Sequence, residues 1–229
     1  MQRLKMSDLI TDAVLNELQR HYDGLRLEIN NDDILVSGIS DKDTIKKVEI
    51  DLEFYLDNSE LPLENLCCRL DNYEPHNDLQ KELLEYAHKL LDLDTAMTGG
   101  IYAWGAPGVG KSHVAIGIAK EFMSKGQDVY FLSAENYRLP DNLGPNQVFI
   151  FDDLNSPYGT YKDNFKKAVI NIHNKGGRIF VTSNISYDEF MDHALKIEEK
   201  QRYMDRTKQM FKVLHIEGDS QREQKAWYQ

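Results

Sequence analysis

Residues 105–112 read GAPGVGKS and match the phosphate-binding pattern G-x-x-x-x-G-K-[S/T] at every position. The apolar residues 101–104 before the pattern predict a short strand, and the residues from Lys111 to Ser124 predict a helix. Glycines let the backbone wrap around an anion, and the start of the helix adds a partial positive charge. In such a loop Lys111 suits the β- and γ-phosphates, and the Ser112 hydroxyl suits Mg²⁺. We therefore expect a strand–loop–helix unit that binds a nucleoside triphosphate. The expected cofactor-binding residues are Gly105, Ala106, Pro107, Gly108, Val109, Gly110, Lys111, Ser112 and His113.

Two carboxylates follow a second apolar stretch. Residues 148–151 read VFIF and predict a buried strand, and Asp152 and Asp153 come directly after it. In a parallel sheet the end of this strand would lie beside the phosphate-binding loop. We expect Asp152 to hold Mg²⁺ through water and Asp153 to polarise the attacking water as a general base. Because Asp reaches less far than Glu, slow hydrolysis is expected.

A third polar group follows the strand predicted over residues 178–182. Thr182, Ser183 and Asn184 would lie at the same edge of the sheet, and Asn184 is the candidate for orienting water near the γ-phosphate. A turn-forming Ser–Asn pair is the alternative interpretation.

From about residue 77 onward, predicted strands and helices alternate. This alternation is typical of a mostly parallel, five-stranded sheet covered by helices on both faces, which is an α/β fold. The strands are expected at residues 101–104, 128–133, 147–151, 178–182 and 211–216, and the helices at 77–91, 111–124, 162–175, 187–200 and 202–208.

Residues 1–70 predict a separate, small α/β module, and residues 71–76 a linker. A helical pattern that Gly24 ends precedes an alternating stretch, 25–29, and a second predicted strand, 34–39, which together predict a hairpin. Ser40 and Asp41 then predict the start of a further helix, and a short strand is expected at residues 66–70.

This module is acidic. Up to Glu74 the chain has 8 Lys and Arg against 17 Asp and Glu, and from Pro75 onward the balance is 19 against 21. Nucleic-acid binding needs clustered cations, so the module is a poor nucleic-acid surface. It is either a partner-binding module for a basic protein or simply well solvated.

The composition excludes several protein classes. Among 229 residues, 41% are hydrophobic and 28% charged, which fits a globular protein rather than a disordered chain. The two cysteines are adjacent in sequence, so no disulfide framework is expected and a reducing, cytoplasmic compartment is indicated. No apolar stretch approaches 18 residues, and we therefore expect no membrane association.

The second region resembles the AAA+ ATPases, and within them the DnaC/DnaI-type helicase loaders and their IstB-type transposition relatives. The resemblance covers about residues 75–222. It is carried by GAPGVGKSH (105–113), VFIFDD (148–153), RIFVTSN (178–184) and RYMDRTKQMFKVLHIEGDSQR (202–222).

The resemblance implies that residues 77–229 are an AAA+ domain that hydrolyses ATP with Mg²⁺. It implies that Arg206 is an arginine finger reaching the nucleotide site of a neighbouring copy, with Arg202 as the alternative, and that Arg222 is a sensor arginine acting within its own subunit. Self-association through the nucleotide site follows from this role.

The chain also departs from the loader pattern. Only 13 residues, 134–146, separate two predicted strands where the loaders carry helices that line a channel for single-stranded DNA, which weakens the case for DNA binding. The 45 residues after Asn184 leave no room for the helical lid of initiators, so a lidless domain is expected.

The favoured interpretation is a replicative helicase loader, with the helicase or another replication protein as partner. The alternatives are an IstB-type transposition helper, an Hda/DnaA-like replication regulator, and a scaffold that binds nucleotide without hydrolysing it.

Overall fold

The computed structural model describes residues 2–5, 10–30, 33–94, 97–133, 138–155, 159–194 and 197–220. The chain forms two compact units, Met1–Cys68 and Arg69–Gln229. The division precedes the residues expected to form a linker, 71–76, which belong to the second unit. Within the described ranges, no helix is both long and apolar enough to cross a membrane.

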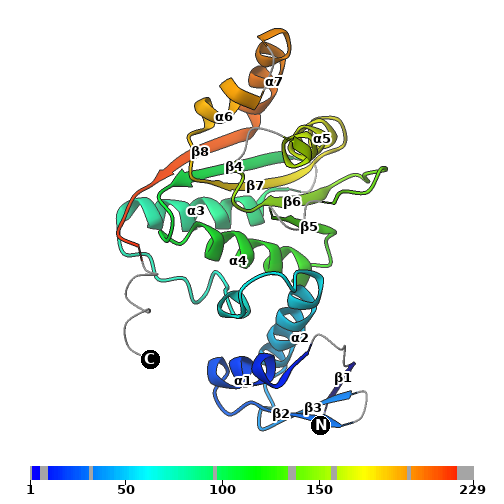
Figure 1. The fold of residues 1–229 in the computed structure, drawn as a ribbon. Coiled ribbons are helices and arrows are strands. Elements are labelled where there is room, and N and C mark those ends of the chain that lie inside the picture. The colour runs from blue at the N-terminus through cyan, green and yellow to red at the C-terminus, as the bar shows by residue number, and fades with distance from the viewer. Residues whose placement is uncertain are drawn as a thin grey trace. The chain divides into compact units, whose positions relative to one another are not determined.

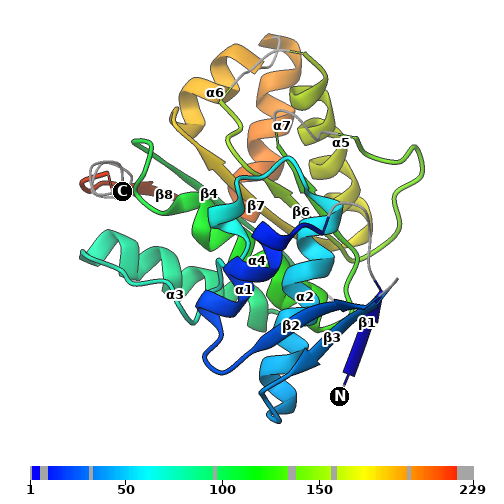
Figure 2. The same ribbon diagram turned by 60° about the horizontal axis from the view of Figure 1, so that its bottom comes forward.

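The first unit combines an antiparallel sheet with helices (Figure 2). Its elements are β1 (Gln2–Lys5), α1 (Asp12–His21), β2 (Arg26–Asn30), β3 (Asp33–Ser37), α2 (Lys42–Asp57) and the 3-10 helix η1 (Leu63–Asn65). The strand order is β1-β3-β2, and the expected hairpin is confirmed because β2 and β3 pair antiparallel, with Ile29 opposite Ile34. Asp41 caps α2 by accepting a hydrogen bond from the Thr44 N–H.

This unit contains one strand that was not predicted and lacks one that was. Strand β1 was not expected, because its sequence QRLK has a single apolar residue and no alternation, and the strand is recruited by pairing with the distant β3. No strand forms at residues 66–70. Leu66 and Cys67 instead bury their side chains in the apolar core of the unit, together with residues of α1 and α2.

The second unit is built on a five-stranded sheet in which every neighbouring pair is parallel, as expected (Figure 1). The strands are β4 (Thr98–Gly105), β5 (Val129–Leu132), β6 (Gln147–Phe151), β7 (Gly177–Ser183) and β8 (Phe211–Ile216), in the order β5-β6-β7-β4-β8. All residues of β6 and β7 are buried, and each strand contains a run of apolar residues, VFIF in β6 and IFV in β7, as is typical of strands covered on both faces.

Helices cover both faces of this sheet. They are α3 (Asp78–Asp92), α4 (Lys111–Ser124), α5 (Gly159–Lys175), α6 (Tyr187–Ala194) and α7 (Ile197–Met210). Figure 1 shows α3 and α4 on one face and the other three on the opposite face. There, Phe165 of α5 makes ring contacts with Phe151 of β6, Phe190 of α6 and Phe211 of β8, which joins two helices to the sheet in one aromatic core.

The predicted break between the last two helices was misplaced. The first helix ends at Ala194 rather than near residue 200, and the second begins at Ile197. No glycine or proline marks the break in the sequence. A tertiary contact accompanies this packing, since the buried Thr207 of α7 is hydrogen-bonded to Tyr187 of α6. Residues 138–146 contain neither helix nor strand, while residues 134–137 lie outside the described residues.

Candidate functional site

The loop between β4 and α4 depends on glycine. Gly105, Gly108 and Gly110 have φ angles of 149°, 85° and 91°, a region that residues with a Cβ rarely adopt. At Gly105 a Cβ would also lie 2.0 Å from the carbonyl oxygen of Ile216 on β8. These three residues let the backbone curl at the start of α4, where free N–H groups favour an anion.

Lys111 is the first residue of α4 and lies in the middle of the site. Its side chain is buried, and its Nζ donates hydrogen bonds to the carbonyl oxygens of Gly105 and Ala106, each at 2.8 Å. Nζ also donates to Oδ1 of Asn184 at 3.2 Å. The ammonium group is therefore held between the glycine loop and the end of β7.

Asp152 lies at the end of β6, beside the start of α4. It is buried, it accepts a hydrogen bond of 2.7 Å from the Thr182 hydroxyl, and it also interacts with the Ser112 hydroxyl. Burial raises the pKa of the Asp152 carboxyl, whereas the hydrogen bonds from Thr182 and Ser112 and the charge of Lys111 act to lower it. The predicted metal-binding pair of Ser112 and Asp152 is thus brought together.

Asp153 has a different environment from its neighbour. It is exposed, and its φ angle of 55° turns the chain sharply after β6. Its backbone N–H donates to the Thr182 hydroxyl at 2.8 Å. One carboxylate is therefore buried against the loop, and the next is open to water.

Asn184 reaches the site from the end of β7. Besides accepting the hydrogen bond from Lys111, it donates its backbone N–H to Oδ1 of Asn155 at 2.6 Å. Two segments far apart in sequence therefore fix this amide next to the lysine. A turn-forming role for the Ser–Asn pair does not by itself account for the contact with Lys111.

The arrangement fits a magnesium–nucleotide complex better than a metal ion held by protein alone. Among the described residues, no group of three His, Cys, Asp or Glu side chains is placed to hold a metal. Mg²⁺ in nucleotide sites usually takes one or two protein oxygens and completes its shell with phosphates and water. Ser112 and Asp152 supply oxygens of that kind.

The sequence placed Thr182 at this edge of the sheet but indicated no role for it, and Asn155 was not predicted at all. The Thr182 hydroxyl links the two acidic residues, and Asn155 positions Asn184. Asn155 follows β6 by four residues, and no motif marks it in the sequence. Two further residues lie close to the loop: a Cβ on Gly108 would be 2.2 Å from Oγ of Ser220, and one on Gly110 would be 2.7 Å from the Tyr73 ring.

Of the remaining predicted residues that the structure describes, His113 and Arg206 are not brought into this cluster. The His113 side chain contacts Arg69 and Asn72. Arg206 is half-buried in α7, shortly before Phe211, where β8 begins. The start of β8 lies at the edge of the sheet opposite the loop. Arg222 lies outside the described residues, as does the side chain of Arg202.

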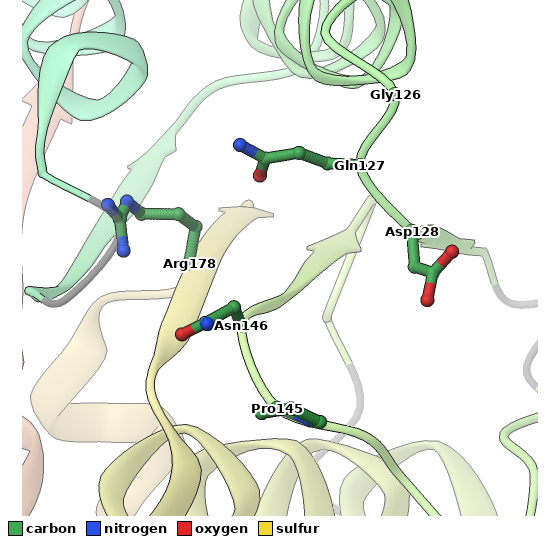
Figure 3. A pocket seen from close by; sticks show the side chains of 6 residues that line it. All are labelled: Gly126, Gln127, Asp128, Pro145, Asn146 and Arg178. Carbon is green, nitrogen blue, oxygen red and sulfur yellow. The ribbon is translucent and has the colours of Figure 1, made fainter.

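A pocket of about 220 Å³ occurs at the opposite edge of the sheet, where β5, β6 and β7 begin (Figure 3). It is lined by Gly126, Gln127, Asp128, Pro145, Asn146 and Arg178. The Arg178 guanidinium donates hydrogen bonds to backbone carbonyls, among them those of Leu93 and Gly177, and so ties the end of α3 to β7. This pocket is remote from the phosphate-binding loop and does not contribute to that site.

No protein-family model matches the chain, and no curated protein is significantly similar to it.

Comparisons of structure find clear similarity in fold. A crystal structure of DnaI superposes with a TM-score of 0.56 at 19% identity, covering 70% of this chain and 93% of that one. A crystal structure of the DnaC helicase loader gives 0.53 at 18% identity, covering 67% and 99%. AMPPCP-bound DnaA from Aquifex aeolicus gives 0.51 at 16% identity, covering 68% and 52%. The α/β fold of the second region of this chain is therefore similar to the fold of DnaI, the DnaC helicase loader and DnaA.

The linkage through Thr182 leads to a testable prediction. In Thr182→Val the fully buried hydroxyl is lost, and both Asp152 and the Asp153 N–H lose a partner. We expect the free energy of unfolding to fall by about 1–3 kcal/mol, because a buried polar group is left unpaired. Urea unfolding followed by circular dichroism measures this, and Thr182→Ser, which keeps the hydroxyl, is the control with a smaller expected loss. Equal losses in the two variants would show that the hydroxyl is not what matters.

Proposed function

We propose that this protein is an AAA+ ATPase that acts as a nucleotide-driven switch and loads a replicative helicase in DNA replication. The observation that carries the proposal is the convergence of Lys111, Ser112, Asp152 and Asn184 at the edge where the parallel strands end. A glycine loop at a helix N-terminus, a buried lysine and a hydroxyl–carboxylate pair are together what a nucleoside triphosphate requires.

In this proposal the loop and the lysine bind the phosphates. The backbone N–H groups of the loop face the anion, and Lys111 turns from the carbonyl oxygens it now contacts toward the β- and γ-phosphates. When the ammonium group exchanges neutral carbonyl oxygens for charged phosphate oxygens, its hydrogen bonds become stronger. Binding is therefore favoured by the electrostatics of the site.

Hydrolysis is assigned to two exposed residues at this edge. The exposed Asp153 is the proposed general base, and Asn184 is proposed to orient the water. Ser112 and Asp152 would hold Mg²⁺, which when bound neutralises charge on the phosphates. The backbone of Asp153 is hydrogen-bonded to Thr182 and Asn155, and its exposed side chain faces the water that it is proposed to activate.

Arg206 is proposed to act on the nucleotide of a second copy. In the described part of the chain it has no recorded hydrogen bond or ion pair with the loop, Asp152 or Asp153, and it stands near the end of the sheet opposite the loop. A guanidinium that cannot serve its own site can serve a neighbouring one, where it neutralises charge that builds on the γ-phosphate.

The loader role rests on the likeness in fold to DnaI and the DnaC helicase loader. The first unit, whose sequence is acidic, is proposed to bind the partner protein. Single-stranded DNA binding receives little support, because residues 138–146 form no helix. The likeness to DnaA supports a second candidate, a replication regulator.

The first prediction for this function separates binding from turnover. Lys111→Ala should abolish tight binding of a non-hydrolysable ATP analogue in isothermal titration. Asp153→Asn should bind the analogue like the wild type, because the amide keeps the shape of the side chain, but should hydrolyse ATP about 10²-fold more slowly or worse. Unchanged affinity in Lys111→Ala, with an unchanged circular dichroism spectrum, would rule out the phosphate-loop assignment.

The second prediction concerns Arg206. Arg206→Ala should retain analogue affinity and lose hydrolysis by roughly 10³-fold, as expected for an arginine finger. Mixing it with Lys111→Ala should restore part of the activity, because the latter variant lends its intact Arg206 to the intact site of the former. The assay needs high protein concentration, so that copies associate. If light scattering shows mixed oligomers and no activity returns, Arg206 is not a finger, and Arg202 is the next residue to test.

The third prediction concerns the partner. The immobilised full chain, loaded with the ATP analogue and Mg²⁺, should retain a replicative helicase from a lysate, identified by mass spectrometry. Lys111→Ala, treated in the same way, should retain much less of it. Selective retention of a transposase, or of the initiator machinery without helicase, would replace the loader role with one of the alternatives.

A further inference from the structure

The turn at the start of the second unit, residues 69–73, packs against the first turns of α4. The Nε2 atom of His113 lies 2.9 Å from the carbonyl oxygen of Arg69 and 2.8 Å from Oδ1 of Asn72. His113 directly follows Ser112, so this contact is one residue away from the proposed metal and phosphate ligands. The turn therefore touches the part of α4 that carries the site.

The hydrogen-bond pattern fixes which group donates. Oδ1 of Asn72 also accepts the N–H of Arg69 at 2.9 Å, which identifies this atom as the amide oxygen. Both atoms facing Nε2 of His113 are thus acceptors, and Nε2 must carry a proton and donate to them. One oxygen of Asn72 then joins the backbone of the turn to the imidazole on α4.

Two glycines allow the turn to approach this closely. A Cβ on Gly117, in the middle of α4, would lie 2.7 Å from the Leu70 nitrogen and 3.0 Å from the Arg69 carbonyl carbon. Glycine destabilises a helix interior, so its presence here is explained by the close contact it permits. Gly110, the last glycine of the phosphate-binding loop, has the same relation to the Tyr73 ring, at 2.7 Å.

Tyr73 is itself unusual. Its side chain is 6% exposed, and its hydroxyl has no hydrogen-bond partner within the described ranges. Burial raises the pKa of Tyr73 to about 12, in keeping with the position of its hydroxyl away from water. The ring is thus used as a rigid apolar support under Gly110 and against His113, at a centroid distance of 5.3 Å.

We propose that residues 69–73 are a positioning element for the phosphate-binding loop, and that Asn72 is its positioning residue, acting through His113. Asn72 and Tyr73 hold the first turn of α4 and the loop from two sides, so the loop keeps the shape that a triphosphate needs. This inference rests on the proposed function, since it assumes that the loop binds ATP. Because small displacements of binding groups strongly reduce their effect, loss of this support should weaken nucleotide binding.

Reciprocity gives the proposal a second consequence. If the turn favours nucleotide binding, bound nucleotide must stabilise the turn by the same factor. The amide of Arg69, which donates to Asn72, should therefore exchange its hydrogen more slowly when a nucleotide is bound. A turn that serves only to stabilise the fold would show no such response.

The experiment compares Asn72→Ala with Asn72→Asp by isothermal titration with a non-hydrolysable ATP analogue. We expect Asn72→Ala to bind about tenfold more weakly, the effect of one lost hydrogen bond. Asn72→Asp should bind within about threefold of the wild type, because a carboxylate oxygen accepts the same two hydrogen bonds. Asn174→Ala, at the exposed end of α5, is the matched control and should bind normally.

Each outcome decides the proposal. Wild-type affinity in Asn72→Ala, or equal weakening in Asn72→Ala and Asn72→Asp, overturns it. Should Asn72→Ala fail to fold, hydrogen exchange in the wild type decides: slower exchange at Arg69 with the analogue supports the proposal, and unchanged exchange overturns it. Lys111→Ala distinguishes failure of the proposed function from failure of the positioning role. Normal analogue binding in Lys111→Ala refutes the proposed function itself. Loss of binding in Lys111→Ala together with normal binding in Asn72→Ala refutes only the positioning role.

Discussion

Parallel pairing of β7 with both β4 and β6 is the interaction on which the candidate site depends. The three strands run in one direction, so their carboxyl ends meet at a single edge of the sheet. The glycine loop follows β4, the two acidic residues follow β6, and Asn184 follows β7. Residues separated by dozens of positions in the chain are brought within hydrogen-bond distance by this register, and the buried apolar strands keep it from slipping.

Within that frame, one hydroxyl gives the two neighbouring aspartates different surroundings. The Thr182 hydroxyl accepts from the Asp153 N–H and donates to Asp152. Asp152 stays buried beside Ser112, and Asp153 turns out to water. Environment sets the protonation and reach of a carboxylate, so adjacent residues of one type can take separate roles. The proposed division into metal binding and general base follows from this geometry.

The loop is supported from outside the sheet as well. Tyr73 and Ser220, which lie near the two ends of the second unit, each contact a different glycine of the loop. The side chain of Asn77, which caps α3, donates to the Glu217 carbonyl oxygen, so the segments before α3 and after β8 are joined next to the loop. The phosphate-binding loop is therefore embedded in contacts, and its shape is a property of the whole second unit.

The sequence by itself determined the class of fold and the chemical elements of the site. The pattern at residues 105–112, the buried strands at 147–151 and 178–182, and the acids and amide that follow them are local signals, because motif spacing and strand burial are encoded within a few residues. Only the tertiary structure decided how these elements are held. The roles of Thr182, Asn155 and Asn72 and the pairing of strand β1 depend on partners distant in sequence. Local pattern carries no information on such contacts, since a hydrogen bond between remote residues forms only after the sheet has aligned them.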